Sequence, residues 1–260
     1  ESGGLAFWVA AIRESFEEMD LPEYMESFAG AAGSYSTPAG YLATEFFSAV
    51  PITLIIFAIV AGTAATAGEE SAGTIDLLLA QPIRRWRIIV EKALGIAAAV
   101  SVALLAGLPG IFLGQLFVDF DIGPLRLVAA MLATLPLLFL FASLAMLLGA
   151  ALPTRAMAVA VATAGAVLAY VVHTLGMLVD ELSEVRKLTP FYWSDASKAL
   201  IGDFEVWCSL VLLAVAAGLV ALAAVAFERR DIAGGREGGW WKQFRRRRKG
   251  REHAPVEAAE

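Results

Sequence analysis

Five stretches of the chain contain no aspartate, glutamate, lysine or arginine, and the charged residues are concentrated between them. The stretches cover residues 46–68, 93–118, 127–154, 156–179 and 206–227. An α-helix rises 1.5 Å per residue, so the shortest stretch, of 22 residues, is about 33 Å long and can cross a hydrocarbon core of about 30 Å. The pattern predicts an all-α polytopic membrane protein with five transmembrane helices.

The composition agrees with this interpretation. Of the 260 residues, 58% are hydrophobic and only 18% are charged, whereas soluble domains have roughly half apolar and about a quarter charged residues. The connections between the stretches are too short for a separate soluble catalytic domain of typical size. The single cysteine, Cys208, excludes an intrachain disulfide.

Lysine and arginine predict the orientation, because they collect in short loops on the cytoplasmic side. Residues 69–92, the turn at Arg155 and the tail after Phe227 hold fifteen of the 20 such residues, and the other connections hold five. The N-terminal arm is therefore predicted outside and the tail inside. Five spans with an external start are unusual for a permease, and the chain opens on glutamate rather than methionine. We therefore expect one further helix before residue 1 and six spans in the natural protein.

The predicted organisation has three parts. Residues 1–45 form an extracytoplasmic arm. Either residues 5–12 are the outer end of the missing helix and the rest is an external helical cap, or the arm is an ordered but idle loop. Residues 46–227 form the transmembrane domain, with a cytoplasmic loop at 69–92 and an external loop at 180–205. Residues 228–260 form a cytoplasmic tail with two tryptophans and a run of five cations. Such a run next to a membrane predicts attachment to an anionic inner leaflet rather than to nucleic acid.

The cytoplasmic loop has the pattern of two short helices. Thr74 can cap the first, Asp76 suits its positive end, and Pro82 disfavours its continuation. The second is predicted to begin near Arg84 and to run into the next span. The first helix carries the apolar residues 77–79 on the cytoplasmic side, and such a patch needs a partner.

This loop resembles the cytoplasmic loop of ABC-2 type permeases, the membrane subunits of a class of ABC exporters. The family pattern is an acidic pair, Gly-Thr, an acidic residue two positions later, an apolar run, a proline and a basic cluster. Asp76 stands where the family more often has glutamate, which keeps the charge. The matching positions are Glu69, Glu70, Gly73, Thr74, Asp76, Leu77, Leu78, Pro82 and Arg85.

The resemblance implies that residues 69–81 form a coupling helix in a groove of a separate P-loop ATPase. Two permease subunits, identical or different, and two ATPase subunits would make one transporter of a prokaryotic plasma membrane. ATP and magnesium would bind in the ATPase, since this chain has no P-loop motif. The chain itself would have no catalytic, cofactor-binding or metal-binding residues. The expected cargo is a hydrophobic or amphipathic drug, antibiotic or lipid-like molecule.

Other interpretations remain open at this point. The first loop helix could simply lie on the lipid, or the chain could be a scaffold that docks another cytoplasmic protein. An ion-coupled secondary transporter would keep ionisable residues near the membrane midplane. The spans offer only His173, for which a hydrogen bond to a neighbouring helix is the preferred interpretation. The ion-coupled alternative would therefore need charges in the missing helix.

Prolines and small residues complete the candidate features of the spans. Pro109 and Pro136 can kink their helices and free backbone carbonyls, which makes them candidates for a translocation path. Alanines recur four residues apart at Ala158, Ala162 and Ala166. This spacing allows close helix approach, either within one subunit or between two.

Overall fold

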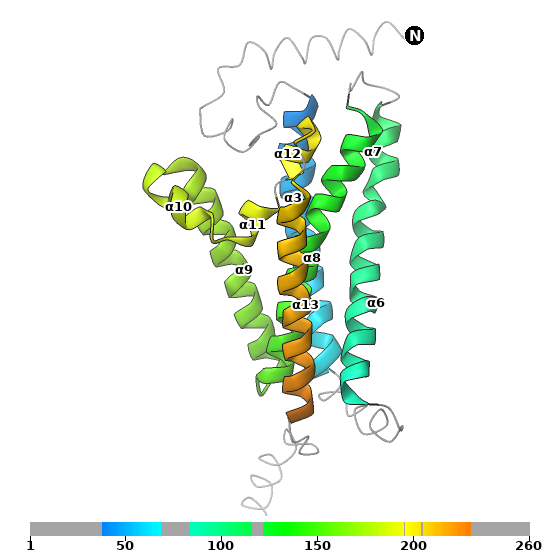
Figure 1. Cartoon of the computed structure of the whole chain (residues 1–260), viewed down its shortest axis with the longest axis vertical. Helices are drawn as coiled ribbons and strands as arrows, with labels where there is room; N and C mark the ends of the chain where they lie inside the picture. Colours follow the sequence, from blue (N-terminus) through cyan, green and yellow to red (C-terminus); the bar gives the residue numbers. More distant parts are fainter. Residues whose placement is uncertain (1–37, 69–83, 116–121, 195, 204, 230–260) are drawn as a thin grey trace, which may run out of the picture.

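The computed structural model describes residues 38–68, 84–115, 122–194, 196–203 and 205–229, which form a bundle of long helices (Figure 1). Five helical segments are long and apolar enough to cross a membrane, and the described residues contain no strand. The predicted all-α class with five spans is therefore confirmed. The long elements are α3 (Pro38–Thr63), continued by the π-helix η2 (Ala64–Gly68), α6 (Arg85–Leu105) with α7 (Gly107–Gln115), α8 (Pro124–Ala151), α9 (Arg155–Leu178) and α13 (Val206–Arg229).

The first span begins earlier than the charge pattern indicated. Helix α3 begins at Pro38, so residues 38–45, which the sequence analysis assigned to the N-terminal arm, are helical. Proline suits the first position of a helix because its missing N–H would be unpaired there. Glu45 lies in the second turn of α3. Its carboxylate bounds the charge-free stretch of the sequence, but the helix extends on both sides of it. The remainder of the predicted arm lies outside the described residues.

The second span is interrupted at Ala106, between α6 and α7. Pro109 has no backbone N–H to donate to the carbonyl of Leu105, and its ring crowds that carbonyl. The Ala106 N–H still donates to the Val102 carbonyl at 2.9 Å, so the chain continues in the same direction after the break. The helix is thus broken three residues before Pro109, whereas α8 continues unbroken through Pro136.

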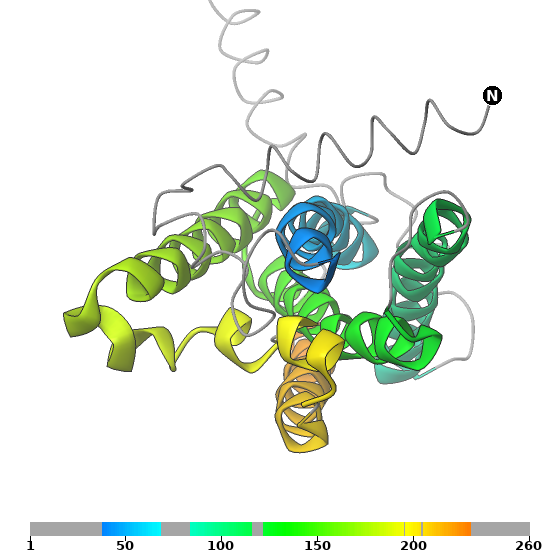
Figure 2. The ribbon, with the colours of Figure 1, turned by 90° about the horizontal axis from the view of Figure 1, so that it is seen from above.

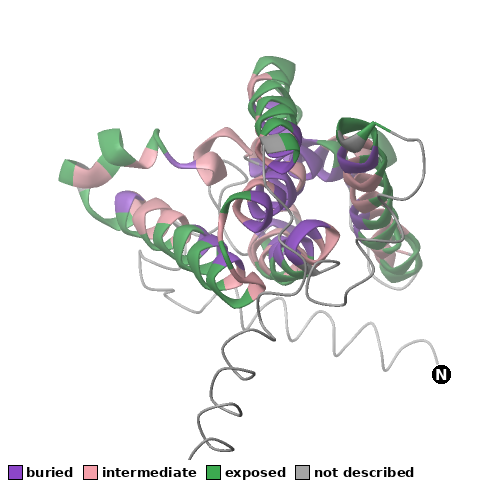
Figure 3. Ribbon diagram, turned by 90° about the horizontal axis from the view of Figure 1, so that it is seen from below, coloured by how far each residue is buried: buried purple, intermediate pink, exposed green. Residues whose placement is uncertain are grey.

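Helix α8 lies at the centre of the bundle and contacts each of the other four spans. Figure 2 shows it between α3 and α13, with α6 and α9 at the two sides. In the most apolar part of α8, 67% of the residues are buried, against 11% for the span made by α6 and α7. Figure 3 shows the buried residues gathered around α8, while the outer faces of α6, α9 and α13 are exposed.

Glycines allow α3 to lie directly on α8. A Cβ atom on Gly62 would stand 2.5 Å from the carbonyl oxygen of Ala142 and 2.9 Å from the Cβ of Ala145. A Cβ on Gly149 would collide with the hydroxyl of Thr66. Close approach of this kind is how helices associate in membranes, because lipid tails are as apolar as the side chains they would replace.

The predicted external loop at 180–205 is largely helical and folds back onto the bundle. It contains η3 (Asp180–Leu182), α10 (Ser183–Arg186), α11 (Pro190–Trp193) and α12 (Ala196–Ile201). Ala199 and Leu200 of α12 are fully buried in a cluster with Leu127 and Ala130 of α8. This segment was missed because its helices are far shorter than a membrane is thick.

The alanines spaced four apart on α9 face the interior of the bundle. Ala158, Ala162 and Ala166 are all buried, and Ala162 and Ala166 belong to the core cluster that includes Ile59 of α3 and Ala145 of α8. Of the two roles left open, packing within one subunit is the one that the structure bears out.

Replacing Gly62 with alanine should destabilise the bundle, because the added methyl group meets backbone atoms of α8 that cannot move aside. Overpacking of this kind costs about 1–3 kcal/mol. Gly165→Ala is the matched control, since nothing lies within 4 Å of a Cβ at Gly165 and alanine is the better helix former. Thermal unfolding in detergent should show a lower midpoint for Gly62→Ala only. Equal midpoints would contradict the proposed packing of α3 on α8.

Candidate functional site

Most residues of the predicted coupling helix lie outside the described residues, namely Glu69, Glu70, Gly73, Thr74, Asp76, Leu77, Leu78 and Pro82. Their role as an ATPase contact stays a prediction. The structure describes where the loop leaves and re-enters the bundle. It leaves from η2 and returns at Arg84, which precedes α6, with Arg85 as the first residue of that helix. The predicted second helix of the loop is thereby confirmed.

The two ends of the loop are tied to each other by Lys92. Its ammonium donates a hydrogen bond of 2.9 Å to the carbonyl oxygen of Ala65, which lies in η2. A π-helix has widened hydrogen bonding and often marks a functional site. The charged donor suits this place because carbonyls at the end of a helix carry partial negative charge. This bond joins the end of the first span to the first turns of α6.

The π-helix is also attached to α8. The hydroxyl of Thr66 donates to the carbonyl oxygen of Met146 at 3.3 Å, next to the close contact between Thr66 and Gly149. Thr66 is buried, so this bond is protected from water. The π-helix η2 is thus bonded both to α6, through Lys92, and to the central helix α8, through Thr66.

At the end of the bundle that carries the loop, the basic residues are placed as they are in proteins at a membrane surface. Arg87 pairs with Glu91 at 2.8 Å, and both side chains are more than half exposed. Trp86 is 44% exposed, as suits an aromatic side chain at the level of the lipid headgroups. Arg155 begins α9 at the same end. The side of the membrane that this end faces remains the prediction made from the charge distribution.

The two candidate prolines of the translocation path occupy different environments. Pro109 lies on the exposed surface of α7, whereas Pro136 is buried within α8. Neither lines the cavity described next. Their role in a path stays a prediction, and the structure does not bring the two together.

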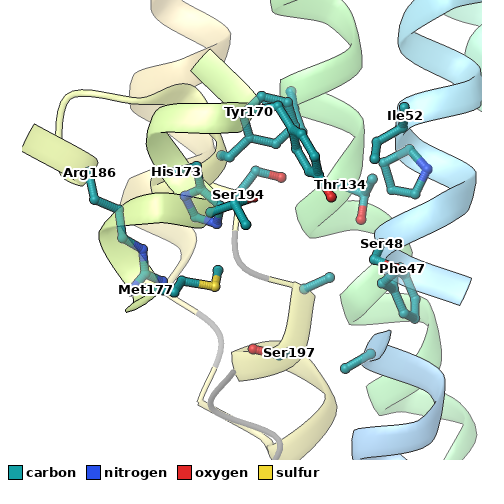
Figure 4. A pocket seen from close by; sticks show the side chains of 16 residues that line it. Phe47, Ser48, Ile52, Thr134, Tyr170, His173, Met177, Arg186, Ser194 and Ser197 are labelled. Carbon is teal, nitrogen blue, oxygen red and sulfur yellow. The ribbon is translucent and has the colours of Figure 1, made fainter. Parts of the chain in front are cut away.

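A cavity of about 110 Å³ lies near the opposite end of the bundle, between α3, α8, α9 and the α10–α12 segment. Figure 4 shows Arg186 and Met177 on one side and Phe47, Ser48 and Ile52 on the other. Thr134 of α8 also lines it. This site leaves no pattern in the sequence, because its walls come from six elements, α3, α8 and α9–α12, that meet only in the folded chain.

The α11 turn closes one side of the cavity by inserting Phe191 among aromatic side chains. The ring centroid of Phe191 lies 5.7 Å from Phe141, 5.6 Å from Tyr170 and 5.8 Å from His173. The imidazole Nδ1 of His173 lies 3.3 Å from the hydroxyl of Thr189. His173 was predicted to bond a neighbouring helix; its partner instead lies in the turn between α10 and α11.

Arg186 brings a positive charge to the cavity. Its guanidinium lies 5.5 Å from the ring centroid of Tyr192, and its Nε atom is buried with no hydrogen-bond partner among the described residues. A buried donor without an acceptor costs about 1–3 kcal/mol. Gly176 allows this placement, because a Cβ there would stand 2.6 Å from the Cβ of Arg186.

The neighbouring cation, Lys187, directly follows α10 and has a different environment. Lys187 donates to the carboxylate of Glu184 at 2.6 Å, at a place where both side chains are exposed. This hydrogen bond and the charge of Glu184 raise the pKa of Lys187. Glu184 is thus engaged by Lys187, and Arg186 makes no ion pair within the described part of the chain.

Residues 4–228 match the model of the protein family described as multidrug efflux system permease Rv1217c, C-terminal domain. The matched region contains the loop at residues 69–92 and reaches to the end of the last apolar segment. This match is consistent with the resemblance to ABC-2 type permeases. A comparison with curated proteins gave no match.

Removing the charge of Lys92 should loosen the ends of the loop. Lys92→Met deletes a hydrogen bond from a charged, half-buried donor, for which a loss of about 1.5–3 kcal/mol is typical. Arg87→Met is the matched control, because its exposed ion pair with Glu91 contributes about 0.3–0.5 kcal/mol. Thermal unfolding of the purified chain should show a clearly larger decrease for Lys92→Met. A larger decrease for Arg87→Met would show that Lys92 does not hold the loop.

Proposed function

The chain belongs to the family of multidrug efflux permeases whose C-terminal domain it matches, and from that premise we propose that it is the permease subunit of an ABC-2 type exporter. In this proposal a separate P-loop ATPase hydrolyses ATP. The permease moves a hydrophobic or amphipathic substrate outward across the plasma membrane. The chain contributes the membrane path and the contact with the ATPase, and it performs no chemical step itself.

The observation that carries the proposal is the cytoplasmic loop within the matched region. Its acidic pair, Gly73-Thr74, Asp76, apolar run and basic cluster follow the ABC-2 pattern described above. An amphipathic helix in a groove is a common way for two proteins to associate, with the apolar side chains as anchors. A soluble ATPase needs such an anchor to act on a membrane partner.

The contacts at the ends of the loop support a mechanical role. When the ATPase dimer closes on ATP, it would carry the coupling helix with it, as in other domain closures. The bond from Lys92 to Ala65 would pass this movement to α3 and α6 at once. Because the span formed by α6 and α7 is the least buried and is broken at Ala106, it is the span that can tilt with least loss of packing.

A second permease subunit, identical or different, would complete the transporter. The exposed faces of α6 and α9 are apolar, with Leu94 and Val102 on α6 and Leu168 on α9 all more than half exposed. In a membrane these faces meet either lipid or another subunit. The basic tail would attach to anionic lipids on the cytoplasmic side, which the charge distribution assigns to the end of the bundle that carries the loop.

The distribution of charge favours this proposal over an ion-coupled secondary transporter. In the described spans the aspartate, glutamate, lysine and arginine residues lie near the helix ends, as Glu91 and Arg126 do. His173 is engaged with Thr189. A proton or sodium relay would need ionisable groups closer to the midplane.

Leu78→Asp should separate the chain from its ATPase. Burying a leucine contributes about 1.5–3 kcal/mol, so its replacement by a carboxylate should reduce ATPase association by about tenfold or more. The measurement is co-purification of the tagged chain from mild detergent, with mass spectrometry of its partners. Membrane insertion should be unchanged.

Leu188→Asp is the matched control, because Leu188 is 83% exposed and lies at the opposite end of the bundle. The control should retain the ATPase at wild-type stoichiometry. A monodisperse wild-type preparation without any P-loop ATPase would contradict the proposed function. ATPase retention by Leu78→Asp would contradict the coupling helix.

A further inference from the structure

We propose that the cavity between α3, α8, α9 and the α10–α12 segment binds the anionic headgroup, a carboxylate or phosphate, of an amphiphilic molecule, with Arg186 as the residue that recognises the charge. One part of this inference, that the bound molecule is the exported substrate, rests on the proposed function. Binding itself does not depend on the ATPase. Nothing in the family match concerns this cavity.

The charge of the cavity wall points to an anion. Arg186 carries a permanent positive charge, and no aspartate or glutamate lines the cavity within the described residues. The ring of Tyr192 stabilises the cation, but a ring face supplies no acceptor oxygen. An arginine binds carboxylate or phosphate through two parallel N–H bonds. The buried Nε of Arg186 lacks an acceptor among the described residues, and an anion in the cavity would give the guanidinium group a charged partner.

Two of the hydroxyl groups that line the cavity already donate to backbone carbonyls. Thr134 donates its hydroxyl hydrogen to the Ala130 carbonyl at 2.9 Å, and Ser194 donates to the Ala133 carbonyl at 3.0 Å. Among the described residues that line the cavity, Arg186 is the one with a permanent charge, and we therefore assign the discrimination between an anion and a neutral group to it. A cation would meet repulsion from the guanidinium in a low-dielectric surrounding.

The size and the apolar side of the cavity point to an amphiphile. Sites that enclose a whole drug-sized molecule have volumes of about 300–1,000 Å³, whereas this cavity has about 110 Å³. That volume suits a headgroup of a few heavy atoms. Phe47, Ile52 and Leu137 line the same cavity, and these side chains suit the first methylene groups of a hydrocarbon tail.

The test uses the purified full chain in phosphatidylcholine nanodiscs and radiolabelled dodecyl phosphate as the probe. We expect saturable binding, and competition by unlabelled dodecyl phosphate but not by dodecyltrimethylammonium. Arg186→Gln should raise the Kd by about tenfold or more, as expected for the loss of a charge-assisted hydrogen bond. Lys187→Gln is the matched control, because it removes the same charge from the adjacent residue, which pairs with Glu184 instead. Its Kd should be unchanged.

Three results would overturn the proposal. These are an unchanged Kd in Arg186→Gln, an equal loss in Lys187→Gln, and equal competition by the cationic amphiphile. Inorganic phosphate distinguishes the two sources of the anion. Weak competition by inorganic phosphate supports an amphiphile, whereas competition as strong as that of dodecyl phosphate would show a site for the free anion and overturn the proposal.

A second measurement needs no variant and therefore does not depend on the folding of Arg186→Gln. Phenylglyoxal modifies arginine side chains, and dodecyl phosphate should protect Arg186 in the wild-type chain, as read by mass spectrometry. Arg155, at the other end of the bundle, should react equally with and without the probe. Equal reaction of Arg186 would overturn the site. If the chain does not bind the anionic probe, its association with the ATPase is unaffected. If the ATPase does not associate, binding of the probe is unaffected, so each proposal can fail without the other.

Discussion

The architecture depends on how closely α3 lies on α8. In a bilayer, moving an apolar side chain from lipid to protein gains little, so helices associate through tight packing and a few hydrogen bonds. Here Gly62 and Gly149 remove the side chains that would hold the two helices apart, and Thr66 adds a hydrogen bond across the contact. The position of α8 in turn determines where α13 and α12 pack. If α3 were displaced, α8 would lose the contacts that hold it in place, and the helices packed on α8 would lose their support.

The same pair of helices connects the two candidate sites. At one end, α3 continues into η2 and so into the loop predicted to contact an ATPase. Toward the other end, α3 supplies Ser48 and Ile52, and α8 supplies Thr134, to the cavity that contains Arg186. The contact between the two helices lies between these ends. A tilt of α3 against α8 would therefore change the shape of the cavity when the loop moves, with no separate relay required.

The sequence predicts the spans well because a bilayer penalises charge so strongly that the charge-free stretches reveal them. It also predicts the break near Pro109, since proline removes a specific hydrogen bond. The segment at 180–205 was not predictable in this way. Its short helices have no bilayer-length signal, and Phe191 and Arg186 acquire their partners only when α11 and α10 fold against α9. Glu45 shows the opposite error, since a charge near the end of a helix was taken as the end of the helix.

The central position of α8 has a consequence for how the protein is made. Its most apolar part has a mean hydropathy of 2.4, close to the 2.3 of the mostly exposed span formed by α6 and α7. A helix that will become buried is therefore as soluble in lipid as one that stays exposed, and each can leave the translocation machinery on its own. Assembly can then follow insertion as a separate stage. During biogenesis, the shapes of the helix surfaces would then determine which of the inserted helices pack against each other.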